Sequence, residues 1–140
     1  MAAPQETVKM GNFGYTTDLL NRTVNLASGI TEANGVGRAL TLDATGPNKF
    51  KLAGDNDIIF ARCEVVEKRD NEASLVGNAK LHLMGVKLPI KSGETVAVGD
   101  FVCGAGNGEI KKQGASPARA SNLYVVDVAS GYATVYSLNS

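Results

Sequence analysis

Residues 81–110 read LHLMGVKLPIKSGETVAVGDFVCGAGNGEI, and this stretch decides the fold class. Apolar side chains alternate with others between glycine-containing turns, a pattern typical of short strands. The expected strands lie at residues 81–90, 94–102 and 109–112. In the middle strand Val96 and Val98 are expected on one side, because successive residues of a strand point to opposite faces. The run 104–108 is expected to form a glycine-rich hairpin turn.

The same pattern of short alternating runs separated by turn residues continues through the rest of the chain. Further strands are expected over residues 38–42, 49–52, 58–67, 123–128 and 132–138, and residues 79 and 80 are expected to join strand 81–90. Leu40 and Leu42 are expected to face one way, and the side chains expected to face the core include Phe50, Leu52, Ile59, Ala61, Cys63 and Val65. Residues 129–131 predict a short hairpin turn with glycine at positive φ. The fold class predicted is therefore all-β, a small barrel-like or sandwich-like domain of short antiparallel strands.

The length, charge and cysteine content of the chain limit which classes of function it can have. The chain has 140 residues, which suits one compact domain, and Lys+Arg and Asp+Glu are both 14. A balanced charge gives no field that favours nucleic acid or an acidic membrane as partner. No apolar run approaches a membrane span and no secretory signal is recognisable, so synthesis in the cytoplasm is expected. Cys63 and Cys103 lack zinc spacing and lie in apolar runs, which predicts two buried free thiols.

The N-terminal part differs from the remainder. Residues 1–14 carry too few apolar side chains to bury a face alone and are expected to form an extended arm that orders against a partner. Residues 15–22 fit a short helical turn, although Thr23 and its neighbours fit an extended segment equally well. The chain is therefore divided into residues 1–29, an arm with a short irregular or helical segment, and residues 30–140, the β domain.

Residues able to carry chemistry are sparse. His82 is the single histidine, and its place between two leucines of a strand favours a surface or interface position over a catalytic base. The sequence Asp55-Asn56-Asp57 lacks the glycine and glutamate of a calcium loop, which favours a turn. The run 104–108 lacks the Lys-Ser/Thr of a phosphate-binding loop. We therefore expect no catalytic residue, no metal and no cofactor.

Two further patterns bear on surfaces and on internal symmetry. Tyr132 and Tyr136 share one side of the last strand, which predicts either a subunit interface or an exposed binding strip. Separately, Val36-Gly37 followed by a strand, a turn and a strand is echoed by Val98-Gly99. The echo indicates two pseudo-equivalent hairpins in one barrel, unless the likeness arises by chance from the abundant glycine.

A family resemblance is carried by residues 90–102, IKSGETVAVGDFV, followed by NGEI at 107–110 and the strand pair at 123–137. This layout resembles the head decoration (cement) proteins of tailed bacteriophages: a strand, a glycine turn, "VxxGD", a valine-rich strand, a hairpin and a terminal pair. Residues 37–52 are similar to that family's earlier strand pair, and the likeness covers about residues 35–138. The N-terminal region is longer than in the smallest members.

The resemblance implies a β-barrel-like homotrimer without enzymatic activity or cofactor, seated on the capsid exterior. Its partners would be the major capsid protein and other copies of itself, with no nucleic acid and no membrane. We hypothesise that the arm adds backbone to a strand edge of the coat, anchored by Val8, Phe13, Tyr15, Leu19 and Leu20. Two alternatives stay open, namely another virion component (a tail, fibre-base or head-completion module) and a carbohydrate-binding or surface-binding β module using Tyr132 and Tyr136. An enzyme dependent on His82 is a distant third.

Overall fold

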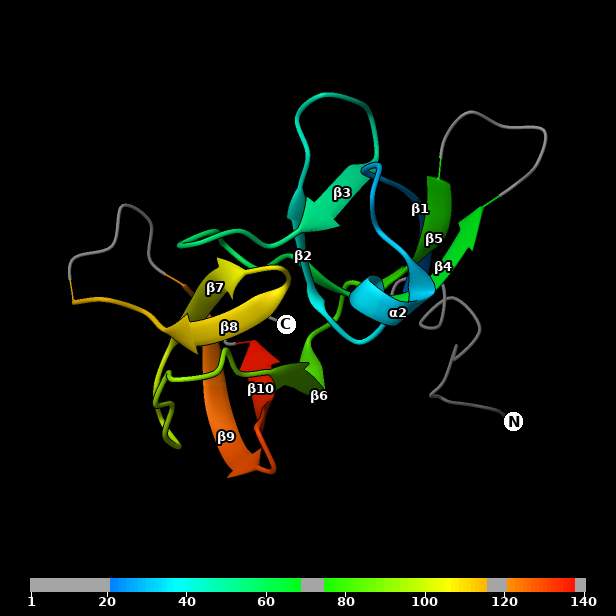
Figure 1. Cartoon of the computed structure of the whole chain (residues 1–140). Helices are drawn as coiled ribbons and strands as arrows, with labels where there is room; N and C mark the ends of the chain where they lie inside the picture. The colour runs from blue at the N-terminus through cyan, green and yellow to red at the C-terminus, as the bar shows by residue number, and fades with distance from the viewer. Residues whose placement is uncertain (1–20, 69–74, 116–120, 138–140) are drawn as a thin grey trace, which may run out of the picture.

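The computed structural model describes residues 21–68, 75–115 and 121–137, and it is built almost entirely of β structure, as predicted. The first unit comprises the described residues up to Leu81, which packs against its core. Its elements are β1 (Asn21–Leu26), α2 (Glu32–Gly35), β2 (Ala39–Leu42), β3 (Lys49–Leu52), β4 (Ala61–Lys68) and β5 (Leu75–Lys80). The strands form a closed barrel in the order β1-β3-β2-β4-β5 (Figure 1).

The second unit comprises the described residues from 82 onward. Its strands are β6 (Met84–Pro89), β7 (Val102–Gly106), β8 (Glu109–Lys112), β9 (Leu123–Ala129) and β10 (Tyr132–Ser137). They form a three-stranded sheet, β6-β10-β9, and a hairpin, β7-β8. Two isolated bridges, Ile90 with Ile110 and Phe101 with Tyr124, join the hairpin to the two edges of that sheet. The second unit is thereby also a ring of five strands, which lies beside the barrel in Figure 1.

The two units have the same strand order and orientation. The first ring runs β1-β3-β2-β4-β5 and the second runs β6-β8-β7-β9-β10, so each strand corresponds to the one five places later. The pair β1 and β3 is parallel, and so is the Ile90–Ile110 bridge next to β6 and β8; the other pairings of both rings are antiparallel. The chain is therefore built from two copies of one five-stranded arrangement.

Several backbone hydrogen bonds and one bulge repeat between the units. Gly37 N donates to Cys63 O at 2.7 Å, and Gly99 N donates to Val125 O at 2.8 Å. The reciprocal bonds also match, Cys63 N to Arg38 O and Val125 N to Asp100 O, both 2.9 Å. The β4–β5 register skips at Glu64 and the β9–β10 register skips at Val126, one residue beyond these matched positions. The Val-Gly echo is thus a structural equivalence, but its hairpins lie in two rings, not in one barrel as expected.

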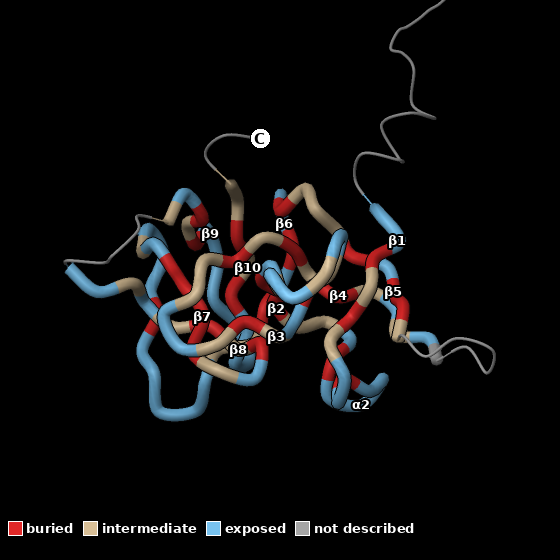
Figure 2. The backbone as a smooth tube through the Cα atoms, turned by 90° about the horizontal axis from the view of Figure 1, so that it is seen from above, coloured by how far each residue is buried: buried red, intermediate tan, exposed pale blue. Residues whose placement is uncertain are grey.

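Each ring has its own apolar core, and the two cores meet. The first core is centred on Val24, Leu26, Leu40, Phe50 and Cys63, and the second on Leu88, Val102, Ile110, Val125 and Val135. Ala39, Ala53 and Ile59 of the first unit contribute to the second core. Figure 2 shows buried positions in the strands of both units. Because side chains of one unit complete the core of the other, we expect them to unfold together.

Several sequence expectations were correct. The strands near 38–42, 49–52, 123–128 and 132–138 are present as β2, β3, β9 and β10. Ser130 and Gly131 both have positive φ in the β9–β10 turn, as a two-residue hairpin requires. The turn at 54–57 is closed by Asp57, whose carboxylate accepts from Gly54 N at 2.8 Å.

The expected strand over residues 94–102 is wrong, because β7 begins only at Val102. Gly99 has φ 92°, and Asp100 closes a turn by accepting from Ala97 N at 2.9 Å. Val96 is buried while Val98 is 66% exposed, so these two valines do not share a face. The expected turn 104–108 is also shorter, since β7 continues to Gly106 and the turn lies at Asn107 and Gly108.

The expected continuous strand 79–90 is divided between β5 and β6, one in each unit. The strand expected at 58–67 begins at Ala61, and the skip in register at Glu64 leaves Val65 exposed instead of buried. Leu42, expected to face the same way as Leu40, is exposed at the end of β2, whereas Leu40 is buried.

The N-terminal boundary also differs. Residues 21–26 form a strand of the barrel, the extended alternative to the helical turn, so the barrel begins before the division expected at residue 30. Residues 1–20, which include the expected arm, lie outside the described residues.

Candidate functional site

A row of aromatic side chains crosses the outer face of the second unit. Tyr124 on β9 pairs in register with Tyr136 on β10, and Tyr136 pairs with Met84 on β6. The ring centroids of Tyr124 and Tyr136 lie 6.3 Å apart, and Phe101 meets Tyr124 edge to face at 6.4 Å. Phe101 is 42% exposed and Met84 39% exposed. Neighbouring aromatic and thioether groups at the surface are typical of interaction sites.

The matching row of the first unit is basic and polar. Arg62 on β4 pairs with Lys80 on β5, and Lys80 pairs with Asn21 on β1, in the same registers as the aromatic row. The Arg62 guanidinium binds the Glu64 carboxylate at 2.5 Å and donates to Lys87 O of β6 at 3.3 Å. The same strand arrangement therefore accepts either basic or aromatic side chains at these positions. The aromatic row is not required by the fold, which makes it our candidate interaction surface.

Both tyrosines predicted from the sequence lie on this face. Tyr136 is a member of the row, whereas Tyr132 is farther along β10, beside Pro89 and Ala129, and is 47% exposed. A role at a subunit interface stays a prediction for both. Sequence reasoning missed Phe101 and Tyr124 because it placed Phe101 inside a strand that does not form. Tyr124 carried a usable signal, since it alternates with the buried Leu123 and Val125.

The other predicted surface residues, Val8, Phe13, Tyr15, Leu19 and Leu20, fall outside the described residues, so the arm hypothesis stays a prediction.

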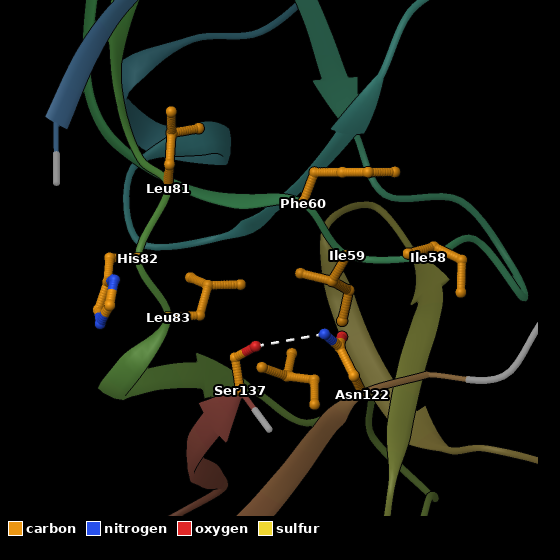
Figure 3. Close-up of a pocket in the computed structure, with 9 residues that line it drawn as sticks. Ile58, Ile59, Phe60, Leu81, His82, Leu83, Asn122 and Ser137 are labelled. Carbon is orange, nitrogen blue, oxygen red and sulfur yellow. Dashed lines mark hydrogen bonds between the residues drawn. The ribbon is translucent and has the colours of Figure 1, made fainter. Parts of the chain in front are cut away.

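A small open pocket lies where the two units meet (Figure 3). Its volume is about 270 Å³, just below the ~300–1,000 Å³ usual for ligand pockets. Leu83 and Ile59 point into it from opposite sides, and the Asn122 amide donates to the Ser137 hydroxyl at 3.4 Å. The His82 ring lies on the far side of its own segment, away from this polar pair. The pocket is mainly an apolar junction between the units.

Both cysteines are buried free thiols, as predicted. Desolvation raises the pKa of Cys63 to about 11, and it also raises the pKa of Cys103. Both thiols are therefore protonated at neutral pH, and protonated thiols are poor nucleophiles. The two side chains act here as small buried apolar groups, and Cys63 is part of the first core.

The acidic turn at 55–57 joins the units. The Asp55 carboxylate binds the Lys111 ammonium of β8 at 2.6 Å, and this hydrogen bond lowers the pKa of Asp55. Within the described residues no group of three or more His, Cys, Asp and Glu side chains is arranged to hold a metal ion. In the same part of the chain we find no helix with the length and apolar character needed to cross a membrane.

Comparisons of the chain with protein-family models, with curated proteins and with solved structures found no match.

Proposed function

We propose that this protein is a structural component of a virion, which binds the outer surface of an assembled bacteriophage capsid and stabilises it. Two observations support the proposal. The turn-and-strand pattern of residues 90–110 and 123–137 resembles that of phage decoration proteins. The structural observation that carries it is the aromatic row Phe101, Tyr124 and Tyr136, which stands where the equivalent unit has Arg62 and Lys80.

The mechanism follows from mass action. A protein that binds the assembled shell and not its separate subunits shifts the equilibrium toward the shell. At a free concentration of 100 times Kd, each occupied site contributes about 2.7 kcal/mol. No catalytic step is needed, and we assign the protein no enzymatic activity.

In this proposal one part of the protein binds the capsid and another binds neighbouring copies of the chain. The N-terminal arm meets the major capsid protein, most simply by adding backbone to an exposed strand edge. The aromatic row, together with Tyr132, meets a neighbouring copy in a homotrimer. Aromatic side chains suit such contacts because they bury a large area while losing few rotatable bonds.

Deletion of residues 1–14 tests the arm. We expect the truncated protein to keep its β circular-dichroism spectrum and its Tm, because the barrel begins at Asn21. We also expect it to lose co-sedimentation with empty expanded capsids. Full-length protein mixed with unassembled coat subunits is the control for shell specificity. Equal capsid binding by the truncated and full-length chains would contradict a role for the arm.

A second candidate is a carbohydrate-binding module, which the 47% exposure of Tyr132 beside the aromatic row favours. Exposed aromatic rings stack on sugar faces in the same way that they pack at protein interfaces. Glycan-array binding that is lost in Tyr132→Ala would support this candidate against capsid decoration. Imaging of labelled particles would separate a decoration protein from a tail or head-completion component by position.

A further inference from the structure

The pocket between the units is lined by corresponding positions from both. The first unit supplies Phe60, just before β4, and Leu81, just after β5. The second unit supplies their counterparts, Asn122 just before β9 and Ser137 at the end of β10. It also supplies Leu83, which is 4% exposed and belongs to the second core. We therefore asked which first-unit residue corresponds to Leu83 and would line the same pocket.

The internal equivalence identifies that counterpart as Leu20. In the second unit Met84 pairs with Tyr136, and in the first unit Asn21 pairs with Lys80. One residue further, Ser137 N donates to Leu83 O at 3.0 Å. The same step in the first unit leads from Lys80 to Leu81 and from Asn21 to Leu20, so the equivalence predicts a Leu81–Leu20 pair.

The register of β1 and β5 gives the same pair independently. Their antiparallel pairing runs without a skip from Leu26–Leu75 to Asn21–Lys80, so the next pair in register is Leu20 with Leu81. Residues facing each other in an antiparallel pair share one side of the sheet. Leu81 packs against the first core, and Leu20 has the same parity along the chain as the buried Val24 and Leu26.

We propose that Leu20 docks in the pocket as the first-unit counterpart of Leu83 and fixes the root of the N-terminal arm there. Residues 1–19 then leave the protein body at the pocket mouth, with a reach of at most about 68 Å at roughly 3.6 Å per residue. This assignment moves Leu20 from the expected capsid anchors to an intramolecular contact. The docking is independent of the proposed function, but its consequence for capsid binding rests on that function.

Paired leucine substitutions test the docking on the isolated protein, without capsids. Leu20→Ala is expected to lower Tm by roughly 6–15 °C, close to the effect of Leu83→Ala, because both would remove a core leucine. Leu19→Ala is the matched control and is expected to change Tm by less than about 2 °C, since alternation along an extended strand would direct residue 19 to the side opposite residue 20. Equal shifts for Leu20→Ala and Leu19→Ala would overturn the proposal.

Amide hydrogen exchange of the unmodified chain decides the matter if Leu20→Ala does not fold. The Leu81 amide is expected to be protected in the full chain and after deletion of residues 1–14, and to lose at least tenfold of that protection after deletion of 1–20. Equal exchange in all three proteins would overturn the docking. Protection that appears only at high protein concentration would also overturn it and would assign the pocket to a second copy. Loss of capsid binding with Leu81 still protected would leave the docking intact.

Discussion

The two five-stranded units have the same strand order but different surface chemistry on their fourth and fifth strands. In the first unit Arg62 and Lys80 face each other, and Arg62 donates to the Lys87 carbonyl oxygen of β6. In the second unit Tyr124 and Tyr136 take these places, and their rings contact each other and Phe101. Because the strand pairing at these positions matches in both units, the fold requires neither chemistry, and we infer that the side chains here reflect contacts beyond the unit itself. For Arg62 that contact is visible, and for the aromatic row we infer a partner.

A second difference shows how the units are joined. Leu42, the residue of β2 that pairs with Phe50, is exposed. Its counterpart on β7, the residue that pairs with Ile110, is the buried Gly104. Gly104 N donates to Asp57 O at 2.8 Å, and Asn56 N donates to Gly104 O at 2.9 Å. One hairpin therefore faces solvent while its copy pairs with a loop of the other unit.

The largest loss of stability is expected at Gly104, where the junction between the units leaves no room for a side chain. In Gly104→Ala the new Cβ would overlap the carbonyl oxygen of Gly54, which is backbone and cannot turn aside. We expect a loss of about 2–3 kcal/mol in the free energy of unfolding, in the upper range for overpacked sites. Urea unfolding followed by circular dichroism measures this loss.

Gly114→Ala is the control for that substitution, because a Cβ at Gly114 meets no atom within 4 Å. Its effect should stay within about 0.5 kcal/mol, as for an ordinary surface change. If Gly104→Ala were equally mild, the two units would not be held by the contacts described. A second unfolding transition appearing in Gly104→Ala would show that the units can unfold separately.

Exchanging the chemistry of the two rows has a smaller effect on stability and a larger one on association. The double variant Tyr124→Arg/Tyr136→Lys carries the first-unit residues in the second unit. We expect it to fold with a loss of about 0.5–1.5 kcal/mol, the usual worth of aromatic pairs. If the row joins copies of the chain, the mass measured by light scattering should fall toward that of one chain.

Lys80→Tyr is the reciprocal control, since it adds an aromatic ring at the first-unit counterpart of Tyr136. It should leave the solution mass unchanged. A double variant that keeps both its mass and its capsid binding would remove the aromatic row from the proposed function, and glycan recognition would then have to be tested separately.

Short strands bounded by turn residues were predictable from the sequence because both signals are local. The strands β2, β3, β9 and β10 and the Ser130-Gly131 turn follow from alternation and turn composition. The strand predicted over the segment containing Val96 and Val98 was wrong. Its residues alternate as in a strand, but Gly99, with φ 92°, turns the chain. Local pattern does not reveal whether an extended segment finds a hydrogen-bonding neighbour.

The internal duplication was nearly invisible for a related reason. The units share backbone hydrogen bonds and a skip in register at Glu64 and Val126, whose side chains have nothing in common. A bulge depends on strand pairing between segments far apart in the chain, so it leaves little trace in composition. It also reverses the facing of later residues, which is why Val65 was expected inside and lies outside. Of the surface row, the sequence offered Tyr136, and the structure added Tyr124 and Phe101.

The smallest effect is expected at the ion pair between the units. Asp55 of the first unit binds Lys111 of the second, and this hydrogen bond lowers the pKa of the carboxyl below its ordinary 3.8 and raises the pKa of the ammonium above its ordinary 10.5. A lowered carboxyl pKa contributes stability that is complete above pH 3.8 and is lost as pH falls through the folded-state value. The raised Lys111 pKa contributes stability that is complete below pH 10.5 and is lost as pH rises through its folded-state value.

Asp55→Asn should therefore lower stability slightly at pH 7, and the difference from the unmodified protein should vanish in strong acid. The effect is small because the Asp55 side chain is 65% exposed and water screens the pair, and added salt should reduce it further. Asp43→Asn is the comparison, since Asp43 accepts from Thr45 within one turn of the first unit and has no part in the junction. Urea unfolding of both variants at several pH values measures the difference. If Gly104→Ala and Asp55→Asn act on the same junction, their effects combined in one chain should depart from the sum, whereas those of Gly104→Ala and Asp43→Asn should add.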